Sequence, residues 1–74
     1  MTVLHIREQG AVVRREAELI RVTLRPTQTQ QAKVLAQSPV HELEQLVIYG
    51  NVQITSQAVA LLLEQDVDVV FMSL

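Results

Sequence analysis

The sequence predicts a mostly β domain of the α+β class, in which a β-meander or sandwich-like set of strands carries one short helix in a terminal βαβ unit. Three observations lead to this prediction. Short apolar segments separated by turn signals fill the first half of the chain. Leu19–Leu24 alternates apolar and polar side chains, as a half-buried strand does. Near the end, an apolar segment, a helical segment and a second apolar segment follow one another. We expect the 74 residues to form a single domain, residues 1–74.

The first half is expected to form consecutive strands. Thr2–Glu8 and Ala11–Arg15 are predicted strands, joined by a turn at Gln9–Gly10. Leu19–Leu24 is the third strand, and it ends before Pro26, which has no N–H to donate to a sheet.

A polar segment then separates the third strand from the fourth. Thr27–Ala32 is rich in Gln and Thr and is predicted to be a loop, and Lys33–Gln37 is predicted to be a short strand. Ser38–Pro39 is a turn signal. Val40–Glu44 fits either one turn of helix or a bent entry into a strand.

The second half is expected to contain a buried strand, a turn, an extended segment, a helix ending near residue 65 and a second buried strand. The four non-helical segments are Leu46–Tyr49, Gly50–Asn51, Val52–Ile54 and Val67–Met72. The hydroxyl of Thr55 can cap the first turn of the helix, and Ser56 is the alternative cap. The two strands that flank the helix should be parallel neighbours or near neighbours.

The predicted helix is apolar on almost every side. Its core-facing stripe is expected to comprise Ala58, Val59, Leu62 and Leu63. Ala60 and Leu61 fall outside this stripe, and a domain of this size has too little protein to cover both sides of a helix. We therefore expect Ala60 and Leu61 to contact another domain or another chain.

Charge is distributed unevenly along the chain. Residues 1–37 hold all six basic residues and three acidic ones, whereas residues 38–74 hold five acidic residues and no basic one. Such a domain can turn its basic half toward an anionic partner such as a nucleic-acid backbone.

The candidate DNA-binding residues are Arg7, Arg14, Arg15, Arg21 and Arg25. Arg21 and Arg25 share a strand face, and hairpins could bring Arg14 or Arg15 beside them. The alternative is that these arginines pair across strands with Glu8, Glu16 and Glu18.

Composition excludes several kinds of site. The absence of cysteine rules out disulfides and thiolate metal sites, and the longest apolar run, Ala58–Leu63, is too short to cross a bilayer. We expect a soluble, cytoplasmic protein without a membrane partner. His41 and Glu44 could be two metal ligands, but a site needs at least three, so no metal is predicted.

No catalytic residue is predicted either. Asp66 and Asp68 lie near a helix end, and nothing in the sequence supplies a pocket or a nucleophile beside them. His5 is expected to be a surface or interface side chain. Tyr49 and Phe71, the only aromatic residues, are expected in the core, which leaves no stacking platform for single-stranded nucleic acid.

Several segments together resemble a known family. Pro39–Ala58, with its Gly50–Asn51 turn, and then Leu61–Gln65 and Val69–Ser73, are similar to the N-terminal β-domain of the CRISPR-associated spacer-acquisition integrase. The opening segment LHIREQGAVVRRE is similar to that family's first hairpin. The resemblance covers essentially the whole chain.

The resemblance implies a structural, dimerising and DNA-holding domain of an integrase that acts in CRISPR adaptation, an antiviral defence. Members of the family are metal-dependent DNA endonucleases and integrases whose catalytic residues lie in a helical domain that follows the β-domain. No enzymatic activity and no cofactor are therefore implied for this chain, and Mg or Mn is expected only in that catalytic domain. The alternative is a stand-alone protein-interaction module with the same fold and no DNA role.

The resemblance also implies partners. They are a second copy of the chain, the helical catalytic domain, the small second subunit of the adaptation complex, and double-stranded DNA. The hairpin tip at Gln9 and Gly10 would lie near the end of the duplex. Ala17 and Asp66 stand where the family often has glycine, and the resemblance therefore implies strained turns at both positions.

Overall fold

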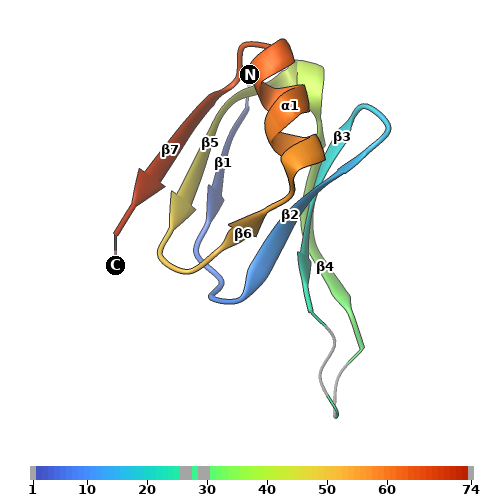
Figure 1. The fold of residues 1–74 in the computed structure, drawn as a ribbon, viewed down its shortest axis with the longest axis vertical. Coiled ribbons are helices and arrows are strands. Elements are labelled where there is room, and N and C mark those ends of the chain that lie inside the picture. Colours follow the sequence, from blue (N-terminus) through green and yellow to red (C-terminus); the bar gives the residue numbers. More distant parts are fainter. Residues whose placement is uncertain (1, 26–27, 29–30, 74) are drawn as a thin grey trace.

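Two β-sheets pack face to face, and one helix closes one side of the pair (Figure 1). The computed structural model describes residues 2–25, 28 and 31–73. The parallel sheet has the order β1-β5-β7, with β1 at Thr2–Ile6, β5 at Leu43–Tyr49 and β7 at Asp68–Met72. The mixed sheet has the order β4-β3-β2-β6, with β4 at Lys33–Pro39, β3 at Leu19–Leu24, β2 at Ala11–Glu16 and β6 at Gln53–Ile54.

The predicted fold class is confirmed. Strands predominate, the helix α1 (Ser56–Glu64) lies between β6 and β7 in the chain, and β5 and β7 are parallel neighbours as expected. Strands β2, β3 and β4 form the antiparallel meander. The undecided segment after β4 contains both predicted forms, because a 3-10 turn at Val40–Glu42 leads directly into β5.

Strand β1 does not belong to the meander. It pairs in parallel with β5, and its Leu4 and Ile6 lie beside Leu46 and Ile48. The turn at Gln9–Gly10 therefore passes from one sheet to the other, and the prediction that it is a hairpin tip is wrong. An alternating pattern shows which side chains of a strand face the core, but it does not show which strand is the partner.

The core lies between the inner faces of the two sheets and α1. Directly opposite residues of neighbouring strands point to the same face, so Val13 and Val22 of the mixed sheet both enter the core. The parallel sheet contributes Ile6, Leu46 and Ile48. From α1 come Ala58, Leu61 and Leu62, which pack in the same cluster.

Both ends of α1 are stabilised by local hydrogen bonds. The predicted cap is confirmed at the start, where the Ala58 N–H donates to the Thr55 hydroxyl oxygen at 3.2 Å. At the end, the N–H groups of Asp66 and Val67 donate to the carbonyls of Leu63 and Leu62 at 3.2 and 2.9 Å. This is the Schellman arrangement, which needs a positive φ at Asp66. That angle is 56°.

The face that α1 turns inward differs from the predicted stripe. Leu61 is 1% exposed, so the prediction that it lies outside the core is wrong. Leu63 and Val59, which were expected inside, are 68% and 36% exposed, and Ala60 is exposed as predicted. The helix packs against both β2 and β7, and this position selects residues 58, 61 and 62, at spacings of three and four.

Two further burial predictions are wrong. Strand β7 forms an edge of the parallel sheet, and most of its side chains are partly or fully exposed, including Phe71 at 67%. Tyr49 is half-buried.

Strand β4 continues through Ser38–Pro39, where a turn was predicted. Part of the predicted Thr27–Ala32 loop lies outside the described residues.

Ala17 and Asp66 have φ angles of 53° and 56°, a region that costs side chains other than glycine about 1 kcal/mol or more. We expect Ala17→Gly to raise the free energy of unfolding by about 0.5–1 kcal/mol, and Asp66→Gly by less, because Asp tolerates this region better than Ala. Urea denaturation followed by circular dichroism measures both. The matched control is Ala60→Gly in the exposed part of α1, which should lower stability by about 1 kcal/mol. A loss of stability in Ala17→Gly as large as in the control would contradict the strain argument.

Leu61 and Leu63 provide a matched pair for the packing of α1. Leu61→Ala should cost about 2–5 kcal/mol, because it opens a cavity in the core. Leu63→Ala makes the same chemical change at an exposed position and should change stability by no more than about 0.5 kcal/mol. Urea midpoints of the two variants decide this, and equal midpoints would show that α1 does not pack in the way described.

Candidate nucleic-acid interface

Three arginines gather on the outer face of the mixed sheet. Arg14 of β2 lies directly opposite Arg21 of β3, so their side chains share a face. Arg25 follows β3 and donates from Nη2 to Oε1 of Gln53. Gln53 pairs with Val12 on the same outer face, two residues from Arg14. We call Arg14, Arg21 and Arg25 the outer basic face.

Neutral side chains hold two of these arginines in place. Arg21 donates from Nε to Oε1 of Gln37 at 3.2 Å, and Arg25 has the Gln53 contact. Arg21 also forms an ion pair with Glu16. Three arginines and one glutamate leave an excess of positive charge. The alternative of cross-strand pairing therefore holds in part, for Arg21.

Arg15 and Arg7 do not join the outer basic face. Arg15 lies opposite Ile20 at the end of β2, donates to the carbonyl of Ala17 at 3.0 Å and lies 3.8 Å from the carboxylate of Glu18. Arg7 follows β1 in the other sheet, and its guanidinium carbon lies 4.8 Å from the centre of the Tyr49 ring. The predicted set of five arginines is thus divided over three places.

Gln9 makes contacts that sequence reasoning did not foresee. Its amide nitrogen donates to the carbonyls of Tyr49 and Arg7 at 3.0 and 3.2 Å, and its amide oxygen accepts from the Asn51 N–H at 2.7 Å. The N–H of Gly10 donates to the Asn51 carbonyl at 2.9 Å. We call this set of contacts the Gln9 clasp. It joins two turns that lie some forty residues apart, so no local pattern could have revealed it.

Tyr49 is the centre of a small cluster beside the clasp. The His5 ring stacks on it at a centroid distance of 6.0 Å, and His5 Nδ1 lies 3.2 Å from the Tyr49 hydroxyl. His5 is exposed, in agreement with its expected surface position. This cluster belongs to the parallel sheet, whereas the outer basic face belongs to the mixed sheet.

The described residues offer no fitting metal site. His41 lies in the 3-10 turn and Glu44 in β5, and no group of three or more His, Asp or Glu side chains in the described part of the chain could hold a metal ion. Asp66 is the residue after the C-cap of α1, and Asp68 begins β7. Both are exposed.

No helix within the described ranges is long and apolar enough to cross a membrane.

Comparison with known proteins identifies the family. Residues 4–74 match the family described as CRISPR associated protein Cas1, and the chain therefore belongs to it. The resemblance drawn from the sequence is confirmed. The comparison with curated proteins gives no match.

Solved structures share the fold. A chain of the crystal structure of a TtCas1–DNA complex matches 99% of this chain at 29% identity and a TM-score of 0.70. A CAS1 protein from Thermotoga maritima and a casposase bound to integration product match 97% of it, at 17% and 16% identity and TM-scores of 0.65 and 0.68. This chain spans 23% of the length of the first protein and 21% of the other two.

The Gln9 clasp should contribute to stability. Gln9→Ala removes three hydrogen bonds and should lower the free energy of unfolding by about 1–2 kcal/mol. Gln57→Ala, at an exposed position of α1, is the control and should change it by less than about 0.5 kcal/mol. Urea denaturation measures the free energy of unfolding of both variants. If the two changes are equal, the Gln9 clasp does not stabilise the fold.

Proposed function

We propose that this chain is the N-terminal structural domain of a CRISPR adaptation integrase, and that its outer basic face holds double-stranded DNA through the phosphate backbone. The observation that carries the proposal is the placement of Arg14 directly opposite Arg21 on an exposed sheet face. Like charges at opposite positions destabilise a sheet, and Glu16 compensates for only part of this charge. Phosphate groups at this face would supply the missing negative charge.

The contacts of the outer basic face favour phosphate binding over base reading. Gln37 and Gln53 hold Arg21 and Arg25 against the sheet, which places their guanidinium groups over a broad surface and not at the tip of a helix or ribbon that could enter a groove. Such contacts fix the position of a duplex and carry little sequence information. Membership of the Cas1 family and the similarity to a chain solved in a TtCas1–DNA complex support DNA as the ligand.

In this proposal the domain holds DNA and does not cut or join it. The metal-dependent chemistry belongs to a helical catalytic domain, and Mg or Mn would bind there. The apolar side chains that α1 and β7 expose, Val59, Leu63, Phe71 and Met72, are where that domain or a second copy of the chain would pack. The small second subunit of the adaptation complex would join the dimer.

Charge reversal tests the outer basic face. The double variant Arg21→Glu/Arg25→Glu should weaken binding of a fluorescent 22-base-pair duplex by about tenfold or more near 50 mM salt, and should reduce the slope of log K against log salt by about two. Two duplexes of unrelated sequence should lose affinity equally. Fluorescence anisotropy of the purified chain measures these values.

The matched control is Arg7→Glu/Arg15→Glu, which makes the same charge change away from the outer basic face. It should weaken binding by less than about threefold. If both double variants lose affinity to the same extent, general charge and not this face holds the DNA, and the proposal is wrong. Circular dichroism spectra confirm that both variants are folded.

A further inference from the structure

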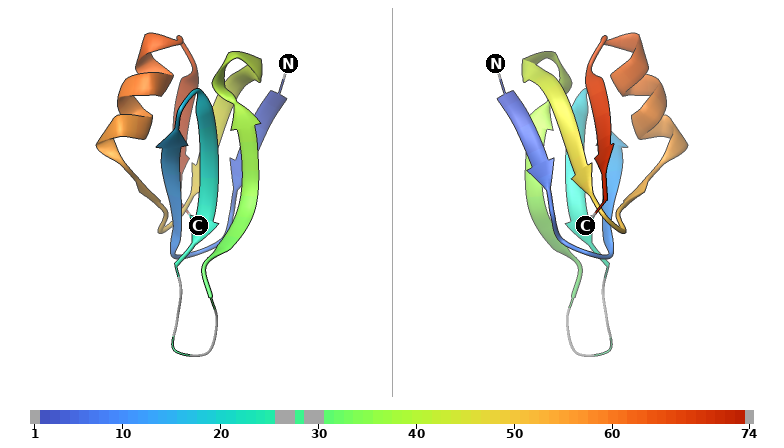
Figure 2. Two further views of the ribbon diagram at one scale, coloured as in Figure 1. Left: turned by 90° about the vertical axis from the view of Figure 1, so that its right-hand side faces the viewer. Right: turned by 90° about the vertical axis from the view of Figure 1, so that its left-hand side faces the viewer.

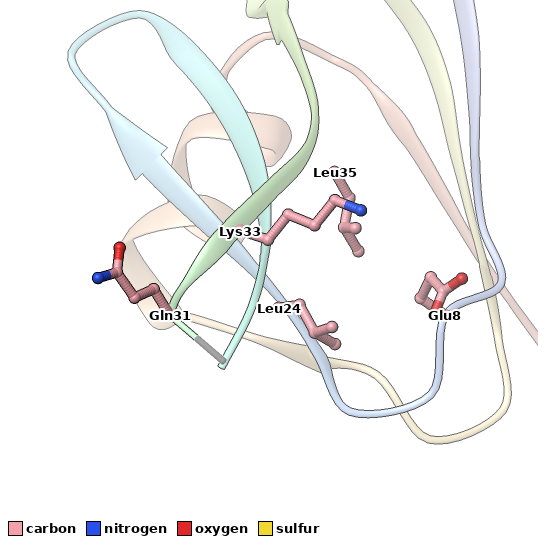
Figure 3. Close-up of a pocket in the computed structure, with 5 residues that line it drawn as sticks. All are labelled: Glu8, Leu24, Gln31, Lys33 and Leu35. Atoms are coloured by element: carbon pink, nitrogen blue, oxygen red, sulfur yellow. The ribbon is translucent and has the colours of Figure 1, made fainter. Parts of the chain in front are cut away.

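A groove runs between the two sheets on the side away from α1. Its two parts, of about 390 and 340 Å³, share Glu8 and Leu35 and therefore adjoin each other. Strands β1 and β4 lie together on this side of the molecule (Figure 2). The first part of the groove, lined by Glu8, Leu24, Gln31, Lys33 and Leu35, opens between them (Figure 3).

Both strands beside the groove are sheet edges. Strand β1 is the last strand of the parallel sheet, and β4 is the last strand of the mixed sheet. An edge strand presents N–H and C=O groups that can pair with another extended chain. Strand β4 spans seven residues, and its proline, Pro39, lies at its very end, so most of this edge can donate and accept hydrogen bonds.

Apolar and polar side chains both line the groove, and we call its charged residues, Arg7, Glu8 and Lys33, the charged rim. The apolar lining comprises Ile6, Val22, Leu24, Leu35 and Ala36. Lys33 belongs to the first part and Arg7 to the second, and Glu8 lies where the two parts meet. The ion pairs found among the described residues are Arg15–Glu18 and Arg21–Glu16, so none of them involves the charged rim.

We propose that this groove binds an extended, acidic segment of a partner protein, which adds to the edge of β4 as a further strand of the mixed sheet. Lys33, Leu35 and Ala36 of β4 line the groove, so inward side chains of an added strand would extend the same apolar wall toward Ile6. Two carboxylates along the segment would meet Lys33 and Arg7. Edge hydrogen bonds supply affinity in this mode of recognition, and the side-chain pockets supply selectivity.

The same features argue against nucleic acid as the occupant. Glu8 lines both parts of the groove and would repel a phosphate backbone, which carries a charge at every nucleotide, whereas a peptide can place its carboxylates at Lys33 and Arg7 and a neutral residue beside Glu8. His5 is the one ring that lines the described groove, and it already stacks on Tyr49, so the groove offers no row of aromatic side chains for successive bases. This surface is separate from the outer basic face, so peptide and DNA binding can be tested independently.

The test uses the 15N-labelled 74-residue chain and a blocked seven-residue peptide in which valine alternates with glutamate. N-methyl groups on alternate residues let the peptide pair along one edge only. At millimolar peptide, the amide signals that shift should be those of β4 and β1. The same peptide with lysine in place of glutamate should bind about fivefold more weakly, because two ion pairs are lost. Lys33→Glu should remove most of this preference.

Val34→Glu is the control, because it adds a negative charge to the same strand at an exposed position that does not line the groove. It should leave the preference for the acidic peptide within about twofold. Absence of binding at millimolar peptide, or a preference for the lysine peptide, would overturn the proposal. So would shifts of the β4 and β1 signals on addition of duplex DNA. The alternative outcome is a chain that is dimeric by light scattering, with slow amide hydrogen exchange along the edge of β4. This result would assign the groove to a second copy of the chain and would also overturn the proposal.

Discussion

The packing of the two sheets against each other is the constraint on which the rest of this structure depends. Each sheet is small and has one strongly apolar face, and neither face could remain in water at an acceptable free energy. The parallel sheet supplies Leu46 and Ile48, and the mixed sheet covers them with Val13, Ile20 and Val22. Burial of these faces also explains why β1 joins β5. In that position Ile6 enters the shared core.

Sheet-on-sheet packing also decides which surfaces remain for binding. One side of the pair is closed by α1, which places Ala58, Leu61 and Leu62 in the same core. On the opposite side, no helix of the described residues covers the space between β1 and β4, where the groove lies. Side chains alternate between the two faces of a strand, and this alternation turns Arg14 and Arg21 to the outward face of the mixed sheet. The outer basic face and the groove, for which we propose binding, are thus distinct surfaces built on the same two sheets.

Two features show where this chain accepts a local cost for its fold. Ala17 and Asp66 hold positive φ angles in the connections that lead into β3 and β7. Both connections are short, with two residues between β2 and β3 and three between α1 and β7, and a residue with positive φ lets the chain change direction within them. The Gln9 clasp stabilises the fold, in contrast to these two residues. One side chain holds together the two turns at which the chain passes between the sheets.

The sequence by itself determined the elements. Alternation marked β3, the apolar run marked β5, and Thr55 marked the start of α1, because each of these signals depends only on neighbours along the chain. It also placed Arg21 and Arg25 on one face, and the family resemblance located both strained turns. These properties depend on residues that lie close together in the sequence, so patterns along the chain can reveal them.

Only the tertiary structure decided which strands pair, which side chains become neighbours and which side chains are buried. Which sheet receives β1, whether Leu61 or Leu63 faces inward, and whether Arg14 or Arg15 lies beside Arg21 all depend on contacts between residues far apart in sequence. Phe71 and Leu61 are both apolar, yet one lies on an edge strand and the other in the core. The hydrophobic effect rewards burial without specifying a partner, and only the packing of the whole domain selects which apolar side chains are covered.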